Sequence, residues 1–247
     1  MAARLNAGEI RWQLHFEAEC DSTQDLARLA AMQGAGEGWT LATDLQRRGR
    51  GRSGRAWVAP AGRALTFSLV LQPPVDVLPL LPLLAAITVA GGIEAATRAI
   101  ADLKWPNDIL LDGKKLAGVL LEHPPGPLVI VGIGVNVNQT ADELPPNATS
   151  LAMALGHPVE REELLAAILN DLANGYERAD REGVQWILPG WRSRSSMLGK
   201  PVSFQRDGAR LHGIAEDIGL DGALLVRTAD GTRISVVAGE VELVRVD

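Results

Sequence analysis

A nearly continuous apolar run at residues 127–138, PLVIVGIGVNVN, limits the possible folds of this chain more than any other segment. We interpret it as a β-strand. The absence of regular polar alternation suggests that this strand is buried on both faces, although periodicity alone does not prove such burial. A strand of this kind has to be covered by other elements on each side.

The other segments of the first two thirds alternate between strand-like and helical patterns. A helix is expected to begin near Ser22, whose side chain can cap it, with Asp25 three residues later. Asp112–Gly113 is a hairpin turn signal between two apolar runs. Strands rich in aromatic or branched residues are predicted at residues 10–17, 38–46 and 63–72.

The longest apolar stretch lies at residues 77–93 and predicts a mostly apolar helix from about residue 79 to residue 100. Pro79, Pro82 and Gly91–Gly92 interrupt the stretch, which is also short for a membrane span. We therefore expect a helix buried in a protein core. Further helical segments are expected at residues 160–180 and 183–196.

The pattern changes near Leu198, beyond which short strands alternate with turn signals such as Asp221–Gly222 and Asp230–Gly231. This spacing is typical of a small β-barrel of about fifty residues. The chain is therefore expected to divide into domains at residues 1–196 and 197–247.

The composition is that of an acidic globular protein, with 247 residues, 47% hydrophobic residues and a net charge of -6. Cys20 is the only cysteine, so no internal disulfide forms, and the four histidines lack metal-ligand spacing. No signal peptide is visible, and a cytoplasmic location is expected. The acidic balance argues against general nucleic-acid binding.

The segment QRRGRGRSGRAW at residues 46–57 places five arginines between glycines in this acidic chain. Glycine lets backbone N–H groups approach an anion, and arginine adds planar donors for phosphate or carboxylate. The loop therefore suits an anion, although it is not a P-loop. A solvated loop or an RNA contact is the alternative from this segment alone. Without an anion, the arginines are expected to repel one another.

A second unusual segment, KWPNDILLDGKKLAG, covers residues 104–118. Asn107 and Asp108 offer oxygen atoms that suit a hydrated Mg²⁺ ion. Lys115 lies at the start of the return strand, where an anion would make its partial burial less costly. The neighbouring Lys114 is interpreted as a surface residue.

Together with DSTQ at residues 21–24 and GIGVNVN at residues 132–138, these segments resemble the bacterial biotin–protein ligases, in the family's order. The resemblance covers essentially the whole chain. It implies an α+β fold, in which a mixed sheet packed with helices, like that of class II synthetases and biotin–lipoate ligases, precedes an SH3-like barrel. No segment before Ile10 is long enough for the helix-turn-helix that some members carry.

The resemblance implies that biotin reacts with ATP to give biotinyl-5′-AMP, and that a lysine of a biotin carboxyl carrier protein then accepts the biotinyl group. Lys115 and Arg52 are the implied catalytic residues. Asp108 is the implied metal residue, for a Mg²⁺ ion that is bound via the ATP phosphates. A homodimer is a further expectation, with no DNA or membrane partner. The implied biotin-binding residues are Ser22, Thr23, Gln24, Gln46, Arg50, Gly51, Arg52, Lys115, Gly118 and Gly132. The implied ATP-binding residues are Arg52, Trp57, Asn107, Asp108, Lys115 and Asn136.

Three other functions stay open from the sequence. A lipoate–protein ligase would share the fold and the adenylation chemistry, although the GRGR segment favours biotin. An RNA-binding protein would use the arginine loop and the barrel, but needs a basic face with exposed aromatic residues. A protein that only sequesters biotin could be distinguished from a ligase only by an assay.

Overall fold

A seven-stranded mixed sheet forms the main layer of the computed structural model, which describes residues 10–206, 208–237, 239 and 241–244. The strand order is β1-β2-β3-β7-β6-β5-β4; β1 and β2 are parallel, and the other neighbours are antiparallel. The strands are β1 (Gln13–Cys20), β2 (Trp39–Gln46), β3 (Ala64–Leu71), β4 (Asp102–Lys104), β5 (Asp108–Leu111), β6 (Lys114–Glu122) and β7 (Val129–Asn136).

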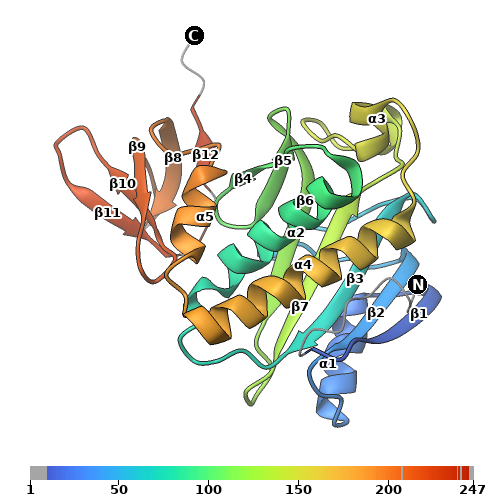
Figure 1. Ribbon diagram of the computed structural model, residues 1–247. Helices are drawn as coiled ribbons and strands as arrows, with labels where there is room; N and C mark the ends of the chain where they lie inside the picture. Colours follow the sequence, from blue (N-terminus) through green and yellow to red (C-terminus); the bar gives the residue numbers. More distant parts are fainter. Residues whose placement is uncertain (1–9, 207, 238, 240, 245–247) are drawn as a thin grey trace.

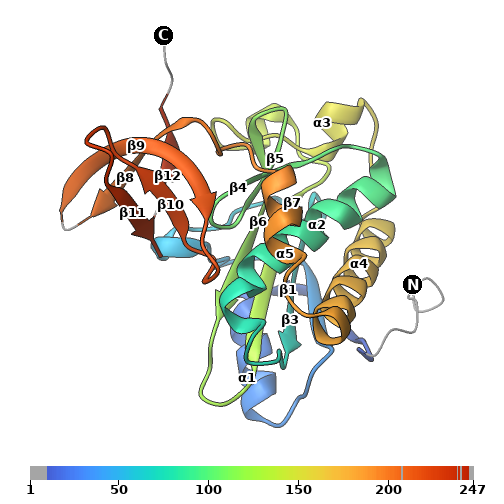
Figure 2. The ribbon, with the colours of Figure 1, turned by 60° about the vertical axis from the view of Figure 1, so that its left-hand side comes forward.

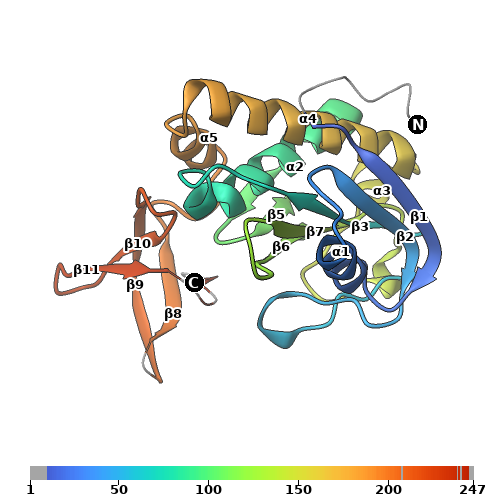
Figure 3. The ribbon, with the colours of Figure 1, turned by 90° about the horizontal axis from the view of Figure 1, so that it is seen from below.

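The central strands β3 and β7 are buried along almost their whole length. The predicted burial of residues 127–138 on both faces is therefore confirmed for the part that forms β7. Helices α2 (Leu81–Thr97) and α4 (Arg161–Glu182) pack on one face of the sheet, and α1 (Thr23–Met32) packs on the other (Figure 1 and Figure 3).

Helix α2 confirms the prediction of a buried apolar helix. A short 3₁₀ turn, η3 (Leu78–Leu80), leads into it, and most of its side chains are buried against the sheet and α4. In the described part of the chain, residues 78–97 are the one helical stretch long and apolar enough to cross a membrane, but 61% of that window is buried inside the structure. Its apolar character is therefore explained by its place in the core.

Shorter helical elements lie in the connections that follow β7. These are η4 (Ala141–Glu143), α3 (Leu151–Leu155) and α5 (Ile187–Ser193). The short helix α3 was not predicted, and α5 is shorter than the helical segment expected at residues 183–196. Trp191 is fully buried on α5 and is part of the core.

The strands predicted after Leu198 form a second, five-stranded antiparallel sheet with the order β11-β10-β9-β8-β12, set apart from the main sheet (Figure 2). Its strands are β8 (Pro201–Arg206), β9 (Ala209–Ile218), β10 (Leu224–Arg227), β11 (Arg233–Val236) and β12 (Val241–Leu243). Polar contacts attach it to the main layer. Nε1 of Trp105 donates to the carbonyl of Gly222 at 3.0 Å, and Arg192 pairs with Asp217 at 2.6 Å.

One local expectation is wrong. Ser22 does occupy the N-cap position of α1 with extended backbone, but its side chain makes no capping hydrogen bond. The backbone N–H of Thr23 instead donates to Oε1 of Gln46 at 2.8 Å. The start of α1 is therefore held by a neighbouring strand. The division of the chain into domains at residues 1–196 and 197–247 stays a prediction.

Candidate active site

A cavity of about 440 Å³ opens on the α1 face of the sheet. Its walls come from the start of α1, the β2–β3 connection, the middle strands and the start of β12. It brings together every site residue predicted from the sequence. Those residues are Ser22, Thr23, Gln24, Gln46, Arg50, Gly51, Arg52, Trp57, Asn107, Asp108, Lys115, Gly118, Gly132 and Asn136.

The strand register explains why residues from distant segments meet here. Ser68 on β3 lies opposite Gly132 on β7, which in turn lies opposite Leu120 on β6. This row crosses the sheet beneath the start of α1, and the next row places Gly134 beside Gly118. These two adjacent rows therefore place Gly118, Gly132 and Gly134 in the wall of the cavity.

The first row carries a buried polar network. Oγ1 of Thr23 lies 2.8 Å from Oγ of Ser68, which donates to Oε1 of Gln24 at 3.0 Å. Nε2 of Gln24 donates to the carbonyl of Ile130 at 3.3 Å. A Cβ atom at position 132 would lie 2.5 Å from Oε1 of Gln24, so glycine is required there for this packing.

Ser22 is buried at the edge of this network, and its Oγ atom has no hydrogen-bond partner among the described residues. Buried hydroxyl groups are normally satisfied, so an unpartnered one that lines a cavity is available to a ligand. Ser68 was missed by the sequence-based assignment. Its signal was a hydroxyl side chain, like that of Thr66, inside the mostly apolar strand predicted at residues 63–72.

Trp57 lies against the second row. A Cβ atom at Gly134 would lie 2.5 Å from Cε2 of the Trp57 indole, so the ring packs directly on the backbone of β7. The backbone N–H of Trp57 donates to the carbonyl of Gly49 at 2.9 Å, which closes the base of the arginine loop. Trp57 lines the cavity, and its implied role in binding ATP stays a prediction.

The β2–β3 connection, light blue in Figure 3, crosses the α1 face of the sheet. It contains η2 (Arg52–Gly54) and an antiparallel bridge between Arg50 and Ala56. The backbone N–H of Gly51 donates to the carbonyl of Arg55 at 2.7 Å. The segment is therefore a small hairpin with internal hydrogen bonds.

Mutual repulsion of the loop arginines, expected in the absence of an anion, does not describe the structure. Arg47 pairs with Glu19 at 2.6 Å, and Arg48 lies 3.9 Å from Asp21. Both arginines are exposed. Acidic side chains of the protein itself thus offset part of the positive charge of the loop.

Two cationic side chains converge on the Asn107–Asp108 segment. Nη1 of Arg52 donates to Oδ1 of Asn107 at 3.1 Å, and Nζ of Lys115 lies 2.7 Å from Oδ1 of Asp108. Burial lowers the pKa of Arg52, but a guanidinium remains charged at neutral pH. One wall of the cavity is therefore basic, whereas the polar network around Thr23 is neutral.

Metal ligands are scarce in this cavity. Among the described residues, no group of three or more His, Cys, Asp or Glu side chains could hold a metal ion. Asp108 is the one predicted metal ligand, and it is paired with Lys115. A metal ion here would depend on oxygen atoms supplied by a ligand.

The fold and the site combine a mixed sheet with a cavity in which a buried neutral polar network lies beside a basic wall. Residues 18–138 match the biotin/lipoate A/B protein ligase family, and residues 197–244 match the biotin protein ligase C-terminal domain. The chain belongs to the biotin protein ligases of this family, which confirms the resemblance and the expected fold class.

Relatives and solved structures extend the match over nearly the whole chain. The biotin–[acetyl-CoA-carboxylase] ligase of Paracoccus denitrificans is 38% identical, over 91% of this chain and 98% of that protein. The ligase of the same name from Mycobacterium tuberculosis is 33% identical, over 96% of this chain and 91% of that protein. The structure of the biotin protein ligase of Aquifex aeolicus in complex with biotin and ATP matches with a TM-score of 0.82 and 30% identity. The match covers 95% of this chain and 99% of that chain.

Proposed function

We propose that this protein is an ATP-dependent ligase that activates biotin as biotinyl-5′-AMP and transfers the biotinyl group to a lysine of a biotin carboxyl carrier protein. The observation that carries the proposal is the meeting of a neutral buried polar network with the Arg52–Lys115 wall in one cavity. The relatives' names and the Aquifex complex support biotin and ATP as the two substrates.

Biotin carries an uncharged ring system at one end and a carboxylate at the other. The ring system would bind where Ser22, Thr23 and Gln46 offer hydroxyl and amide groups, and the free Oγ of Ser22 supports this placement. The carboxylate would then point toward Lys115. Hydrogen-bonding sites of this kind discriminate strongly against analogues that leave buried polar groups unpaired.

In the first step, a carboxylate oxygen of biotin attacks the α-phosphorus of ATP. A bond forms between this carboxylate oxygen and the α-phosphorus. The bond from the α-phosphorus to the oxygen that bridges to the β-phosphorus breaks, and pyrophosphate leaves with the electron pair of that bond. Two anions have to approach each other, so stabilisation of the transition state by positively charged groups dominates catalysis. Lys115 and Arg52 would supply that charge, with Asp108 and Asn107 fixing their positions.

In the second step, the amine of a carrier lysine attacks the acyl carbon of the adenylate. An amide bond forms, the acyl–oxygen bond breaks, and AMP leaves while the amine loses a proton. Water would destroy the mixed anhydride, so the cavity has to remain covered until the carrier arrives. The loop hairpin at residues 47–57 is placed to provide that cover.

Mg²⁺ is part of the proposal. Asp108 and the amide oxygen of Asn107 would be its protein contacts, and phosphate oxygens would complete its coordination, because the cavity offers no three-residue acidic cluster among the described residues. When bound, the ion would neutralise phosphate charge. We also propose a cytoplasmic homodimer without DNA or membrane partners; light scattering after gel filtration tests the dimer.

Biotin-dependent exchange of labelled pyrophosphate into ATP tests this function. We expect exchange with biotin and none with lipoate, since the named relatives are biotin ligases. Exchange driven by lipoate alone would favour the lipoate ligase. Retarded RNA migration at moderate salt, without any exchange, would favour RNA binding; the acidic partners of Arg47 and Arg48 and the net charge of -6 argue against it. Biotin binding without any exchange would indicate a sequestering protein.

A further inference from the structure

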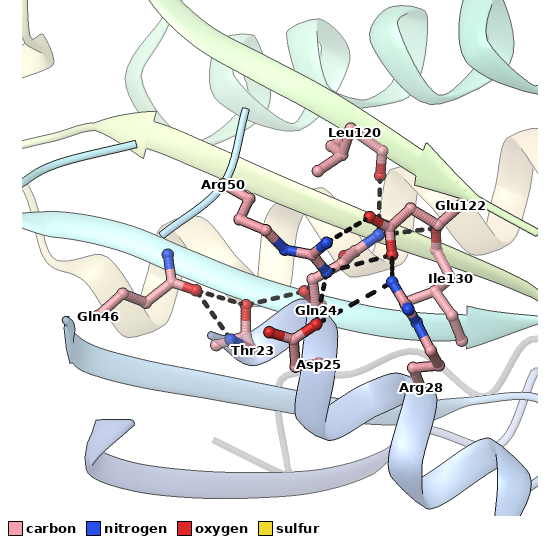
Figure 4. A network of polar contacts seen from close by, with 10 residues as sticks. Thr23, Gln24, Asp25, Arg28, Gln46, Arg50, Leu120, Glu122 and Ile130 are labelled. Carbon is pink, nitrogen blue, oxygen red and sulfur yellow. Dashed lines mark hydrogen bonds and ion pairs between the residues drawn. The ribbon is translucent and has the colours of Figure 1, made fainter. Parts of the chain in front are cut away.

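The side-chain amide of Gln24 is held at both ends by the protein. Gln24 is only 3% exposed, and its Nε2 atom lies 3.3 Å from the carbonyl oxygen of Ile130 and 3.5 Å from that of Leu120 (Figure 4). Both carbonyl oxygens only accept hydrogen bonds, so the amide has one favourable orientation. Its Oε1 atom therefore faces Ser68.

Ser68 is fully buried, and its hydroxyl group has one proton for two neighbours. Oε1 of Gln24, at 3.0 Å, only accepts, whereas Oγ1 of Thr23, at 2.8 Å, either donates or accepts. If Ser68 donated to Thr23, Oε1 of Gln24 would have no donor among the described residues. Because a buried acceptor without a donor is costly, the proton of Ser68 belongs to Gln24.

This assignment also decides the role of Thr23. Since Ser68 donates to Gln24, the 2.8 Å contact is a hydrogen bond only when Thr23 donates to Ser68. Oε1 of Gln46 already accepts the backbone N–H of Thr23 at 2.8 Å and lies further, at 3.1 Å, from the Thr23 hydroxyl. Thr23 lines the cavity, so its hydroxyl group presents lone pairs there and no proton.

We propose that Gln24 and Ser68 are positioning residues that fix the Thr23 hydroxyl as a hydrogen-bond acceptor, so that the cavity selects a ligand with an N–H group at this position. Gln24 thus acts through Ser68, whereas the resemblance implied a direct contact with biotin. The assignment of this N–H group to one of the two ring N–H groups of biotin rests on the proposed function. The direction of the hydrogen bonds does not.

A site of this kind distinguishes an N–H group from an oxygen atom. A ligand oxygen against Thr23 would bring two acceptors together, and turning the Thr23 proton toward it would break the chain to Gln24. Lipoate has no N–H group at its ring end, so it lacks the donor that Thr23 requires. Cyclic carbamate analogues of biotin, with oxygen in place of either ring N–H, provide a closer probe.

Neutron diffraction from crystals of the deuterium-exchanged protein tests the hydrogen-bond directions without any ligand. We expect the deuterium atom of Thr23 to point to Ser68 and that of Ser68 to point to Gln24. A deuterium atom of Ser68 that points to Thr23 would overturn the proposal, whether or not the protein binds biotin.

Calorimetry with biotin and both carbamate analogues tests the selection. We expect wild type to bind the weaker analogue about 10²-fold less tightly than biotin. Ser68→Ala frees the Thr23 proton, and Gln24→Leu lets Ser68 donate to Thr23, so each variant should reduce this ratio at least about fivefold. A merely structural role would weaken the binding of all three ligands alike, and an unchanged ratio in folded variants would contradict the proposal.

Ser203→Ala is a matched control, because it removes a buried serine hydroxyl from β8, outside the residues that line the cavity. It should leave the ratio unchanged. In the double variant of Ser68→Ala and Gln24→Leu, the ratio should fall no further than in the stronger single variant, since both act on one chain of hydrogen bonds. Reductions that multiply would contradict this chain.

The outcomes separate this proposal from the proposed function. Wild-type protein that binds biotin and both analogues equally would refute the selection by Thr23 and leave the ligase function intact. Wild-type protein that binds no biotin would refute the function, and the neutron structure would still decide the direction of the hydrogen bonds.

Discussion

Lys114 and Lys115 are neighbours in the chain with different surroundings. Lys115 pairs with Asp108 in the cavity, whereas Lys114 is exposed. We expect Lys115→Ala to slow pyrophosphate exchange by about 10²–10³, because the cation acts mainly on charge that develops in the transition state. Biotin binding, measured by calorimetry, should weaken only moderately. Lys114→Ala is the control, and near-normal exchange by Lys115→Ala would refute the assigned role.

Arg52 gives a second prediction at the scale of one residue. Arg52→Gly removes a phosphate-directed group and adds backbone freedom to the hairpin. We expect this variant to keep making biotinyl-5′-AMP but to leak it, so that lysines of a bystander protein become biotinylated. A streptavidin blot measures this labelling, with the exposed Arg48→Gly as control. Wild-type labelling by an active Arg52→Gly variant would mean that Arg52 does not retain the intermediate.

The site residues differed in how well the sequence revealed them. The segments at 46–57 and 104–118 were singled out because chemically unusual side chains cluster there, whereas the site residues at 21–24 were implied only by the resemblance to the biotin–protein ligases. Ser68 was missed, because a single hydroxyl inside a mostly apolar strand is not an unusual feature of a sequence. Only the register across β3, β7 and β6 brings Ser68 beneath α1, and strand register between distant segments is not visible in the sequence.

At the scale of elements, α2 is joined to the end of α5 by a partly buried ion pair. Arg194 donates to both carboxylate oxygens of Glu94, and these hydrogen bonds lower the pKa of Glu94 below its ordinary value of 4.5. A lowered pKa means that the pair stabilises the fold above pH 4.5 and that this contribution is lost as the pH falls through the folded-state pKa.

We therefore expect Glu94→Gln to lower the free energy of unfolding by about 1–3 kcal/mol at pH 7, and by progressively less below pH 4.5. Urea denaturation across this range measures the difference. The neighbouring Asp171 should behave in the opposite way, since burial raises its pKa above 3.8 and its ionisation opposes folding as the pH rises. Asp171→Asn should thus stabilise the protein at pH 7. A Glu94→Gln deficit independent of pH would contradict this account.

The elements themselves were predicted unequally. The apolar runs that became β3, β7 and α2 were recognised because burial on all sides leaves few polar residues in them. Helix α3 was not predicted, because five residues are too few to show a helical period. The Ser22 cap was predicted from local preference alone, whereas Gln46, on a different strand, takes over the backbone N–H of Thr23.

At the scale of the whole molecule, the C-terminal sheet contributes directly to the cavity. Val241 and Glu242 line it, and Nε1 of Trp105, which also lines it, donates to the carbonyl of Gly222 in the C-terminal part. We expect a chain that ends at Ser196 to retain a folded catalytic layer but to lose most transfer to a carrier domain. Circular dichroism and a transfer assay measure the two properties. Full transfer by the truncated chain would show that this sheet takes no part in either step.

Transfer to a carrier lysine is the most direct test of the whole account. An isolated biotin carboxyl carrier domain would be incubated with the enzyme, biotin and ATP, and its intact mass and modified residue determined by mass spectrometry. We predict a single biotinyl addition at one lysine, dependent on ATP, absent with lipoate and strongly reduced with Lys115→Ala. An unmodified carrier alongside a folded enzyme, or a lipoyl adduct in place of a biotinyl one, would contradict the proposed function.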